Sequence, residues 1–494
     1  MLDIFPTQVD LKKAFQAGKS YLFAAEIAMS EFNHIAICRE LKQQNSHLFL
    51  LQSAEKAGER SRFSVVATDP DLIYEAGSQA ATIKDVSGKV IQEQADQIKL
   101  LREFKEMLLE SQLPKTYPSM ANALFGYLAY DAIRFVEKTI PDHNPDPINI
   151  PLARFIRARK VIIYDRQKNL VYIIIRAVAA ESAGLYQQAR QQINKLLQLI
   201  NAANKNFSQQ EGFVKMRQNS SEFRPEMSKE KFKAIVQKCQ EYIKAGDVFQ
   251  IVPSQRFVAD FSADPLEFYD DLSKVNPSPY MFYVDFPDFQ LIGASPEVMV
   301  RLQSGEVTIR PLAGTRKRGK DKQEDQALAR NLLNDPKEIA EHLMLIDLSR
   351  NDIARIAESG TVKVTEKMQI EYYSHVMHIS SNVVGRLAPG LDALDALFSA
   401  LPVGTVSGAP KVRAMQIIDE LESSKRSFYA GAVAYLAADG NMDSCIILRS
   451  CLLKEGKIYA QTGAGIVADS SPEQEYQETM NKVRIIRHIL GDVE

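Results

Sequence analysis

The chain has 494 residues, of which 45% are hydrophobic and 25% charged, a profile typical of a globular protein with a large core and not of a disordered chain. Sixty Lys and Arg against 62 Asp and Glu leave a formal charge of −2, which argues against a nucleic-acid partner. The four cysteines form no CxxC pair, and no signal peptide or apolar run long enough to span a membrane is visible. We therefore expect a cytoplasmic protein with no membrane partner.

The first 200 residues carry short apolar runs that predict strands, followed by one helix. Strands are expected at His47–Gln52, Arg62–Ala67, Lys160–Tyr164 and Val171–Ile175, the last two as a hairpin, and a helix at Leu185–Ile200. The next segment, Asn201–Glu222, is rich in Asn, Gln and Ser, which favours a linker or a long surface loop. We accordingly divide the chain into a region 1–210, a linker 211–223 and a region 224–494.

The second region opens with a helix after Ser228 that presents one apolar face and ends at Gly246. Strands are then expected at Val248–Phe257, Gln290–Ile292, Val298–Leu302, Tyr373–Val384, Ala430–Leu436, Cys445–Leu453 and Lys457–Gln461. Strands follow strands more often than they alternate with helices. This order favours an α+β fold with antiparallel sheets over a doubly wound fold.

Two expected helices each carry a pair of acids. Glu338 and Glu341 lie three residues apart on the helix that begins at Asp335, and Glu475 and Glu478 repeat this spacing after Pro472. A solvated helix face explains either pair singly, and Glu338 also occupies the third helical position of a capping box. Two such pairs on separate helices are nevertheless how bundle-type metal sites are assembled, and hard oxygen ligands favour Mg²⁺.

Three glycine-rich segments, residues 309–315, 402–411 and 461–465, could bring backbone N–H groups close to a carboxylate. Lys411, Arg316 and Arg449 could add positive charge beside them. Each segment alone is most often just a turn, and the spacing fits neither a dinucleotide loop nor a Walker A loop. Together with a metal site, the segments indicate a small polyanionic substrate. His378, on the strand after residue 372, is by itself more often a structural than a catalytic residue.

Several long motifs resemble those of the chorismate-utilising enzymes and occur in the order that this family shows. They are GASPE at 293–297, PLAGT at 311–315, DPKEIAEHLMLIDLSRND at 335–352, SHVMH at 374–378, PVGTVSGAPK at 402–411 and QTGAGIV at 461–467. The likeness covers nearly all of residues 224–494, and residues 47–165 resemble the N-terminal part of the anthranilate synthase component I branch. It implies large antiparallel sheets packed as a sandwich with helices on the outside.

Two positions separate the reactions within this family. Members that form isochorismate or salicylate have a water-activating Lys where this chain has Gln250, and aminodeoxychorismate synthases carry a Lys where this chain has Ala313. The resemblance therefore implies ammonia as the nucleophile and anthranilate as the product. Aminodeoxychorismate or isochorismate formation, an amino-acid sensor without catalysis and a two-carboxylate hydrolase are the alternatives.

The resemblance also implies roles for individual residues. Mg²⁺ would be held by Glu341 and Glu478, with Glu338 and Glu475 in support. Glu297 would protonate the leaving hydroxyl, and His378 would act in the loss of pyruvate. Gln250 is a third catalytic position. The residues expected to bind chorismate are Gly314, Thr315, Thr405, Tyr429, Arg449, Gly463, Ala464 and Gly465.

An effector and a partner are implied as well. The motif NPSPYM at Asn276–Met281 resembles a site for the inhibitor L-tryptophan, formed by Ser53, Pro279, Tyr280 and Met281. Gln52 departs from this pattern, because it replaces the usual acid. No glutamine-amidotransferase signature surrounds any of the four cysteines, so we expect ammonia from a separate glutamine amidotransferase subunit in a hetero-oligomer.

Overall fold

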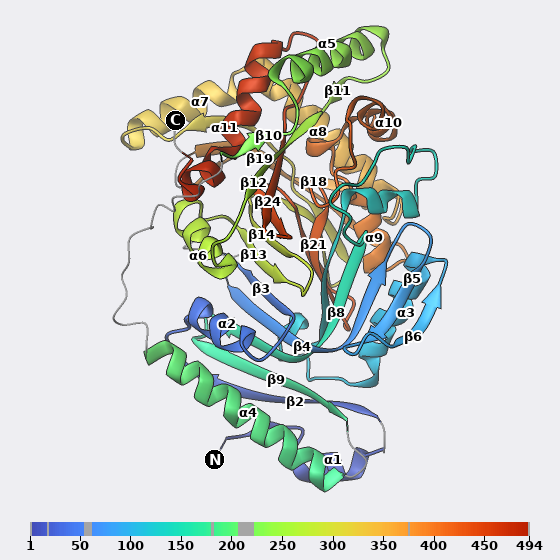
Figure 1. Ribbon diagram of the computed structural model, residues 1–494, viewed down its shortest axis with the longest axis vertical. Coiled ribbons are helices and arrows are strands. Elements are labelled where there is room, and N and C mark those ends of the chain that lie inside the picture. Colours follow the sequence, from blue (N-terminus) through green and yellow to red (C-terminus); the bar gives the residue numbers. More distant parts are fainter. Residues whose placement is uncertain are drawn as a thin grey trace.

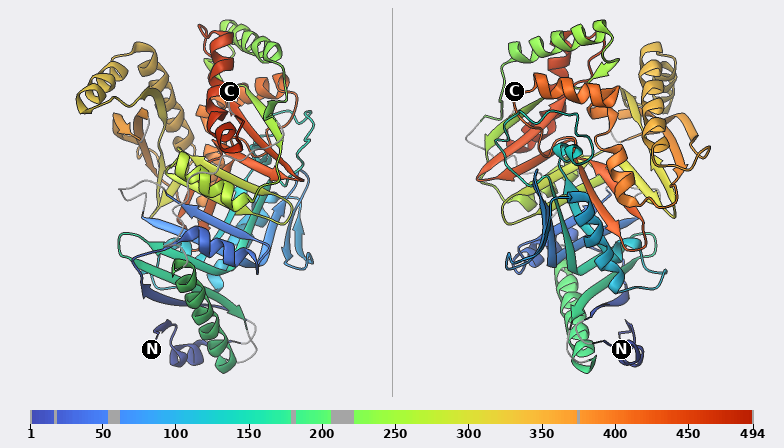
Figure 2. Two further views of the ribbon diagram at one scale, coloured as in Figure 1. Left: turned by 60° about the vertical axis from the view of Figure 1, so that its left-hand side comes forward. Right: turned by 90° about the vertical axis from the view of Figure 1, so that its right-hand side faces the viewer.

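The computed structural model describes residues 2–16, 19–53, 62–178, 182–205, 222–373 and 376–492. Helices α1, α2 and α4 lie at one end of the molecule, and α5, α7, α8, α10 and α11 lie at the other end (Figure 1). Strands run between these two groups. Figure 2 shows the gold α7 and α8 on one side of the upper end and the red α11 on the other.

The described residues contain 22 strands that form one antiparallel hydrogen-bonded network, together with a separate two-stranded sheet. The strands of the first region are β1 (Ile4–Phe5), β2 (Ser20–Ala28), β3 (Leu48–Gln52), β4 (Phe63–Ala76), β5 (Ala81–Asp85), β6 (Val90–Gln94), β7 (Ala123–Leu128), β8 (Ala153–Asp165) and β9 (Leu170–Val178). Those of the second region are β10 (Arg224–Pro225), β11 (Gln250–Ile251), β12 (Ser254–Asp260), β13 (Tyr280–Asp285), β14 (Gln290–Ser295), β15 (Val298–Gln303), β16 (Glu306–Ile309), β17 (Leu312–Lys317), β18 (Lys363–Tyr372), β19 (Val376–Arg386), β20 (Gly408–Ala409), β21 (Ala432–Ala437), β22 (Met442–Ile446), β23 (Ser450–Lys454) and β24 (Lys457–Gly463).

Helices cover the outside of these strands. They are α1 (Gln8–Ala14), α2 (His34–Lys42), α3 (Gln97–Glu106), α4 (Ser182–Lys205), α5 (Lys229–Ala245), α6 (Pro265–Val275), α7 (Lys322–Leu333), α8 (Pro336–Ala354), α9 (Ala393–Ala400), α10 (Lys411–Leu421) and α11 (Pro472–Leu490). The expected α+β class with a large antiparallel sheet is confirmed. None of the described helices combines the length and the apolar character needed to cross a lipid bilayer.

The two faces of the sheet carry separate cores, because successive side chains of a strand point to opposite faces. On β3, Phe49 belongs to the larger core, whereas Leu48 and Leu50 belong to the second core. The larger core also contains α9 residues such as Leu397, and the second core contains residues of α2, α4, α6 and α11. This alternation explains why the sheet is buried on both sides.

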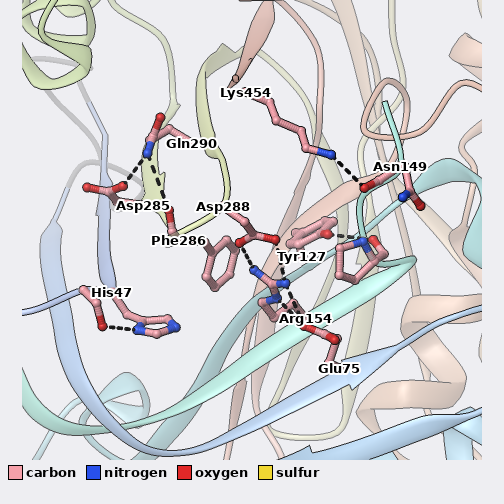
Figure 3. A network of polar contacts seen from close by, with 12 residues as sticks. His47, Glu75, Tyr127, Asn149, Arg154, Asp285, Phe286, Asp288, Gln290 and Lys454 are labelled. Carbon is pink, nitrogen blue, oxygen red and sulfur yellow. Dashed lines mark hydrogen bonds and ion pairs between the residues drawn. The ribbon is translucent and has the colours of Figure 1, made fainter. Parts of the chain in front are cut away.

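Strands of the two regions pair directly with each other. β3 pairs with β13, and β7 pairs with β21. Buried Arg154 of β8 adds an ionic link, because its guanidinium contacts Glu75 of β4 at 2.7 Å and Asp288, after β13, at 2.5 Å (Figure 3). The guanidinium also lies 4.7 Å from the ring centre of Phe286. Hydrogen bonds and charge therefore join both sides of the division that the sequence predicts.

Two apolar runs that were expected to be single strands are each divided into two. The run Val248–Phe257 is interrupted at Val252 and Pro253, so β11 and β12 belong to different sheets. A proline has no N–H to donate to a continuous ladder. The run Cys445–Leu453 turns between β22 and β23, where Arg449 has a left-handed φ of 50°. Periodicity alone does not reveal a turn inside an apolar run.

The polar segment Asn201–Glu222, expected to be a linker or a long surface loop, begins as a helix, because α4 continues to Lys205 and so includes its first five residues. Most of the remaining segment, residues 206–221, lies outside the described residues. The strand expected at Arg62–Ala67 is also longer than the sequence indicates, since β4 extends to Ala76.

Candidate active site

A cavity of about 260 Å³ lies between α8, α11 and the strand ends around β17 and β24. It brings together most of the residues that the sequence singles out, from motifs up to 228 positions apart. Its lining includes Gln250, Glu297, Gly314, Thr315, Glu341, His378, Thr405, Tyr429, Arg449, Gly463, Gly465 and Glu478. Ala313, Leu345, Gln461, Thr462 and Lys482 also line it.

Helix α8 supplies one acidic wall. Its start follows from the sequence, because the Asp335 carboxylate accepts the backbone N–H groups of Lys337 and Glu338 and Pro336 occupies the first turn. Glu341 lines the cavity, whereas the Glu338 carboxylate forms an ion pair with Arg316 at 2.9 Å and is not part of the lining. Burial raises the pKa of Glu341, and the negative charges of Glu338 and Glu478 raise it further.

Helix α11 supplies the opposite wall. Glu478 lines the cavity and contacts Lys482, one turn later on the same helix, at 2.8 Å. Glu475 does not line the cavity, but burial raises its pKa and the charge of Glu478 raises it further. The sequence did not single out Lys482, although its i, i+4 spacing from Glu478 places both side chains on one face.

These carboxylates fit a hydrated Mg²⁺ ion. Within the described ranges, no three His, Cys, Asp or Glu side chains are already gathered closely enough to hold a metal by themselves. Mg²⁺ usually keeps several waters and takes only one or two carboxylates besides an anionic substrate. Glu341 and Glu478 are oxygen donors of that kind. They lie close enough for the negative charge of Glu478 to raise the pKa of Glu341. Glu338 would first have to leave Arg316, so it fits an indirect role better.

Glu297 is the most perturbed acid of the cavity. Its side chain is buried beside Thr405, whose hydroxyl donates to the two carboxylate oxygens at 3.2 and 3.3 Å. Burial raises the pKa of Glu297 to about 8, although the hydrogen bond from Thr405 and the charges of Arg449 and Lys482 act in the opposite direction. Glu297 therefore holds a proton near neutral pH and can act as a general acid.

His378 is held in one tautomer by the backbone. Its Nδ1 lies 2.9 Å from the carbonyl oxygen of Gly314, which can only accept, so Nδ1 carries the proton and donates it. The neutral ring then has its lone pair on Nε2. Burial lowers the pKa of His378, and the ring of Tyr373 packs edge-on at 5.5 Å. A neutral imidazole with a free Nε2 lone pair can accept a proton.

Arg449 provides a cation in the cavity wall. Burial lowers its pKa, and the nearby carboxyl of Glu297 acts in the opposite direction. Within the described part of the chain, its guanidinium makes no hydrogen bond or ion pair that occupies it. A partly buried guanidinium is suited to bidentate binding of a carboxylate. By contrast, Lys411 forms a 2.7 Å ion pair with Asp352 and lies outside the lining, so the sequence overstated its role.

Glycines shape the cavity wall at three points. Gly314 has a φ of 61°, and a Cβ there would lie 2.9 Å from Leu332. A Cβ at Gly463 would lie 3.0 Å from the Tyr429 hydroxyl, and one at Gly465 would lie 2.8 Å from the amide nitrogen of Gln250. Each position excludes a side chain. Ala464, between the last two, is fully buried and packs into a hydrophobic cluster outside the lining.

Gln250 links the wall to α8. Its amide nitrogen donates to Glu341 Oε1 at 3.2 Å. Its Oε1 atom is buried and has no hydrogen-bond partner among the described residues. A buried carbonyl oxygen without a partner is costly, so it favours a donor ligand in the cavity.

A second cavity, of about 230 Å³, contains the residues expected to bind an effector. Ser53, Pro279, Tyr280 and Met281 all line it. Among the described residues, neither Ser53 Oγ nor Gln52 Oε1, both buried, has a hydrogen-bond partner. The two polar atoms could therefore bind a small polar ligand. Within the lining, Arg301 and Asp443 form an ion pair at 2.7 Å.

Comparisons with known proteins agree with this geometry. A family model described as chorismate binding enzyme matches residues 47–488. Anthranilate synthase component 1 of Cereibacter sphaeroides is 45% identical over 491 residues, which cover 97% of this chain and 96% of that protein. The crystal structure of anthranilate synthase component I from Streptococcus pneumoniae superposes with a TM-score of 0.74 at 37% identity, covering 88% of this chain and 94% of that one. The menaquinone-specific isochorismate synthase of Escherichia coli shares the fold at 17% identity, with a TM-score of 0.71 and 98% of each chain covered.

Proposed function

The chain belongs to the family of chorismate binding enzymes, and from that premise we propose that it is the component 1 subunit of an anthranilate synthase. The reaction converts chorismate and ammonia to anthranilate, pyruvate and water. Relatives named anthranilate synthase component 1 that span nearly the whole chain support the product. The single observation that carries the mechanism is the buried Glu297, whose pKa burial raises to about 8, inside a cavity that also contains Arg449, His378 and two further carboxylates.

The first chemical step replaces the C4 hydroxyl of chorismate by ammonia at C2. Hydroxide is a poor leaving group, so an acid must protonate it as its bond to carbon breaks. Glu297 holds the required proton, because burial raises its pKa to about 8. Arg449, next to Glu297, would bind a carboxylate of chorismate and so fix the leaving hydroxyl near the acid.

Gln250 is suited to position ammonia and not to activate water. Its amide has no basic atom, but its buried Oε1 can accept a hydrogen bond from ammonia. Formation of isochorismate needs a base that removes a proton from water, which this residue cannot provide. Ala313 lines the cavity where the aminodeoxychorismate synthases carry Lys, and its methyl group offers no nucleophile. Both residues favour direct amination and an anthranilate product.

The second step eliminates pyruvate from the aminated ring and makes the ring aromatic. A proton must leave the C2 carbon while the bond to the enolpyruvyl oxygen breaks. His378 would accept this proton, and the contact of its Nδ1 with the carbonyl of Gly314 supports the role, because it leaves the lone pair on Nε2. Thr315, whose hydroxyl lies 3.1 Å from the same nitrogen, helps to keep the ring in place.

Mg²⁺ is part of the proposal. Glu341 and Glu478 would hold it, with Glu338 and Glu475 in support. When bound, the ion would neutralise the ring carboxylate of chorismate and withdraw electron density from the ring. Glu341 also orients Gln250, because its carboxylate accepts a hydrogen bond from the amide nitrogen of Gln250.

A partner, an effector and a location complete the proposal. A glutamine amidotransferase subunit would supply ammonia in a hetero-oligomer, because ammonia near neutral pH is almost wholly ammonium and so not nucleophilic. L-Tryptophan would bind the 230 Å³ cavity at Ser53, Pro279, Tyr280 and Met281 and inhibit the enzyme. All four cysteines are free and buried, which supports a reducing compartment such as the cytoplasm.

Release of pyruvate from chorismate by the purified chain tests this function. We expect release with ammonium salts at raised pH and none with glutamine alone. Pyruvate release with glutamine as the sole nitrogen source would contradict the two-subunit proposal. Chorismate consumption without pyruvate release would contradict anthranilate formation.

A further inference from the structure

Within the described part of the chain, the imidazole of His378 is hydrogen-bonded at only one of its two nitrogens. The carbonyl oxygen of Gly314 and the hydroxyl of Thr315, both on β17, lie 2.9 and 3.1 Å from Nδ1. Contacts at one nitrogen fix the position of that atom, but the torsion that turns a histidine ring has a broad minimum. The direction of the Nε2 lone pair therefore depends on what packs against the ring.

Tyr373, which directly follows β18, packs against this ring. The two ring centres lie 5.5 Å apart, and the ring planes meet at 69°. Edge-to-face packing at this separation is a preferred geometry of aromatic pairs. The backbone brings Tyr373 to this place, because its N–H donates to the carbonyl of Val376 at 2.8 Å and Glu371 is the cross-strand partner of His378. The pairing of β18 with β19 thus makes the two rings meet.

The hydroxyl end of Tyr373 is anchored by an ion pair. It donates to Glu371 Oε2 at 2.9 Å, and Glu371 Oε1 contacts the guanidinium of Arg310. Arg310 also lies 3.5 Å from the carboxylate of Glu366 on β18. A phenol that is tied at its hydroxyl and packed at its ring has little freedom to move. We call Arg310, Glu371 and Tyr373 the histidine support.

The histidine support lies outside the catalytic cavity. His378 lines that cavity, whereas none of the three support residues does. All three line a small neighbouring cavity of about 30 Å³, which shares Pro296 and Leu312 with the catalytic one. A substrate in the catalytic cavity would touch His378 and not Tyr373. Tyr373 can therefore influence the reaction only through the ring that it holds.

Only one of the two proposed chemical steps depends on the orientation of His378. Amination uses Glu297, Arg449 and Gln250, whereas loss of pyruvate needs a base for the C2 proton. As that proton passes to Nε2, the C–H electron pair forms the new ring double bond, and the enolpyruvyl oxygen leaves with the C–O electron pair. A displacement of about 1 Å can lower the rate of such a step by about 10²-fold. A misoriented His378 should therefore slow the loss of pyruvate alone.

From these contacts we propose that Tyr373 is a positioning residue for His378 in the loss of pyruvate, and that Glu371 and Arg310 hold it in place. The proposal rests on the proposed function, which assigns the C2 proton to His378. It adds that the histidine support acts after amination. Its failure leaves an aminated ring that still carries the enolpyruvyl group.

The test follows the two steps separately in the full-length chain with Mg²⁺ and ammonium salt. The chain is used in molar excess over chorismate, so that one turnover is observed. Chorismate consumption reports amination, pyruvate release reports the second step, and mass spectrometry detects the aminated intermediate. Tyr373→Leu, which removes the aromatic contact, should lower the rate of pyruvate release by about tenfold or more. Its chorismate consumption should stay within about twofold of wild type, and the aminated intermediate should accumulate.

Three further variants complete the test. Tyr373→Phe keeps the ring but loses the hydrogen bond to Glu371, so its pyruvate release should fall between wild type and Tyr373→Leu. Tyr372→Leu makes the same change at an exposed neighbour whose ring lies 5.1 Å from the guanidinium of Arg318, and it should alter neither step. His378→Ala removes the base itself and should accumulate the same intermediate.

The outcomes separate this proposal from the proposed function. Equal loss of both steps in either Tyr373 variant would show a merely structural residue and overturn the proposal. Pyruvate release at the wild-type rate in Tyr373→Leu would overturn it as well. Absence of the intermediate in His378→Ala, or absence of pyruvate release by the wild-type chain, would instead reject the proposed function on which it rests.

Discussion

Replacement of the buried acid Glu297 by Gln should make the protein more stable and much less active. Burial raises the pKa of Glu297 from 4.5 to about 8. At pH 7 the unfolded carboxyl is therefore ionised while the folded one keeps its proton. Each pH unit between 4.5 and 7 removes about 1.4 kcal/mol from the free energy of unfolding, on the order of 3 kcal/mol in all. A neutral Gln of the same size lacks this penalty.

The sign of the effect defines the assay. A raised carboxyl pKa leaves stability intact below pH 4.5, lowers it as the pH rises and has no further effect above about pH 8. Denaturant unfolding of Glu297→Gln should thus match wild type near pH 4.5 and exceed it by on the order of 3 kcal/mol at pH 7. The ammonium-dependent rate should fall by about 10²- to 10⁴-fold, the usual contribution of a general acid.

The pH dependence of the wild-type rate should report the same titration of Glu297. With free ammonia held constant, the rate should decline above about pH 8 as Glu297 loses its proton. Thr405→Val should shift this decline to higher pH, because the hydrogen bond from Thr405 lowers the pKa of Glu297. Thr405→Ser is the matched control that keeps the hydroxyl. A stability difference that does not change with pH, or a fully active Glu297→Gln, would refute the reasoning.

Three further predictions concern the metal, the substrate and the effector. After EDTA treatment, Glu341→Gln should need at least about tenfold more Mg²⁺ than wild type for half-maximal activity. The control Glu473→Gln, on an exposed side of α11, should behave like wild type. Equal Mg²⁺ dependence in Glu341→Gln and wild type would remove Glu341 from the metal site. Arg449→Ala should raise the KM for chorismate by about tenfold or more, since it removes a partly buried cation of the cavity wall that would bind a carboxylate of chorismate. An unchanged KM would show that Arg449 does not bind substrate. Ser53→Ala and Met281→Thr should weaken inhibition by tryptophan without changing kcat, and unchanged inhibition in both would place the effector elsewhere.

The parts of the site that could be predicted from the sequence depend on local patterns. The diacid spacing of Glu338 and Glu341, with the N-cap at Asp335, predicts the helix and the face on which both acids lie. Local patterns do not predict which acid reaches the cavity. That outcome depends on Arg316 of the neighbouring strand β17, which forms an ion pair with Glu338.

Arg449 illustrates what the sequence hides. Its apolar neighbours predict a continuous strand, in which its side chain would alternate with theirs. Instead, β22 ends at Ile446, and the left-handed backbone at Arg449 directly precedes β23 and sets the partly buried guanidinium beside Glu297. Such a turn is stabilised by contacts made across the sheet, so tertiary structure decides it and local preference does not. The raised pKa of Glu297 likewise follows from burial, which its own sequence neighbours do not specify.

The mass of the product formed from chorismate, Mg²⁺ and nitrogen-15 ammonium by the wild-type chain tests the central claim most directly. We predict fluorescent anthranilate that contains one labelled nitrogen, together with one pyruvate for each chorismate consumed. An unlabelled hydroxylated isomer of chorismate, or a labelled product that still retains its enolpyruvyl group, would contradict this account.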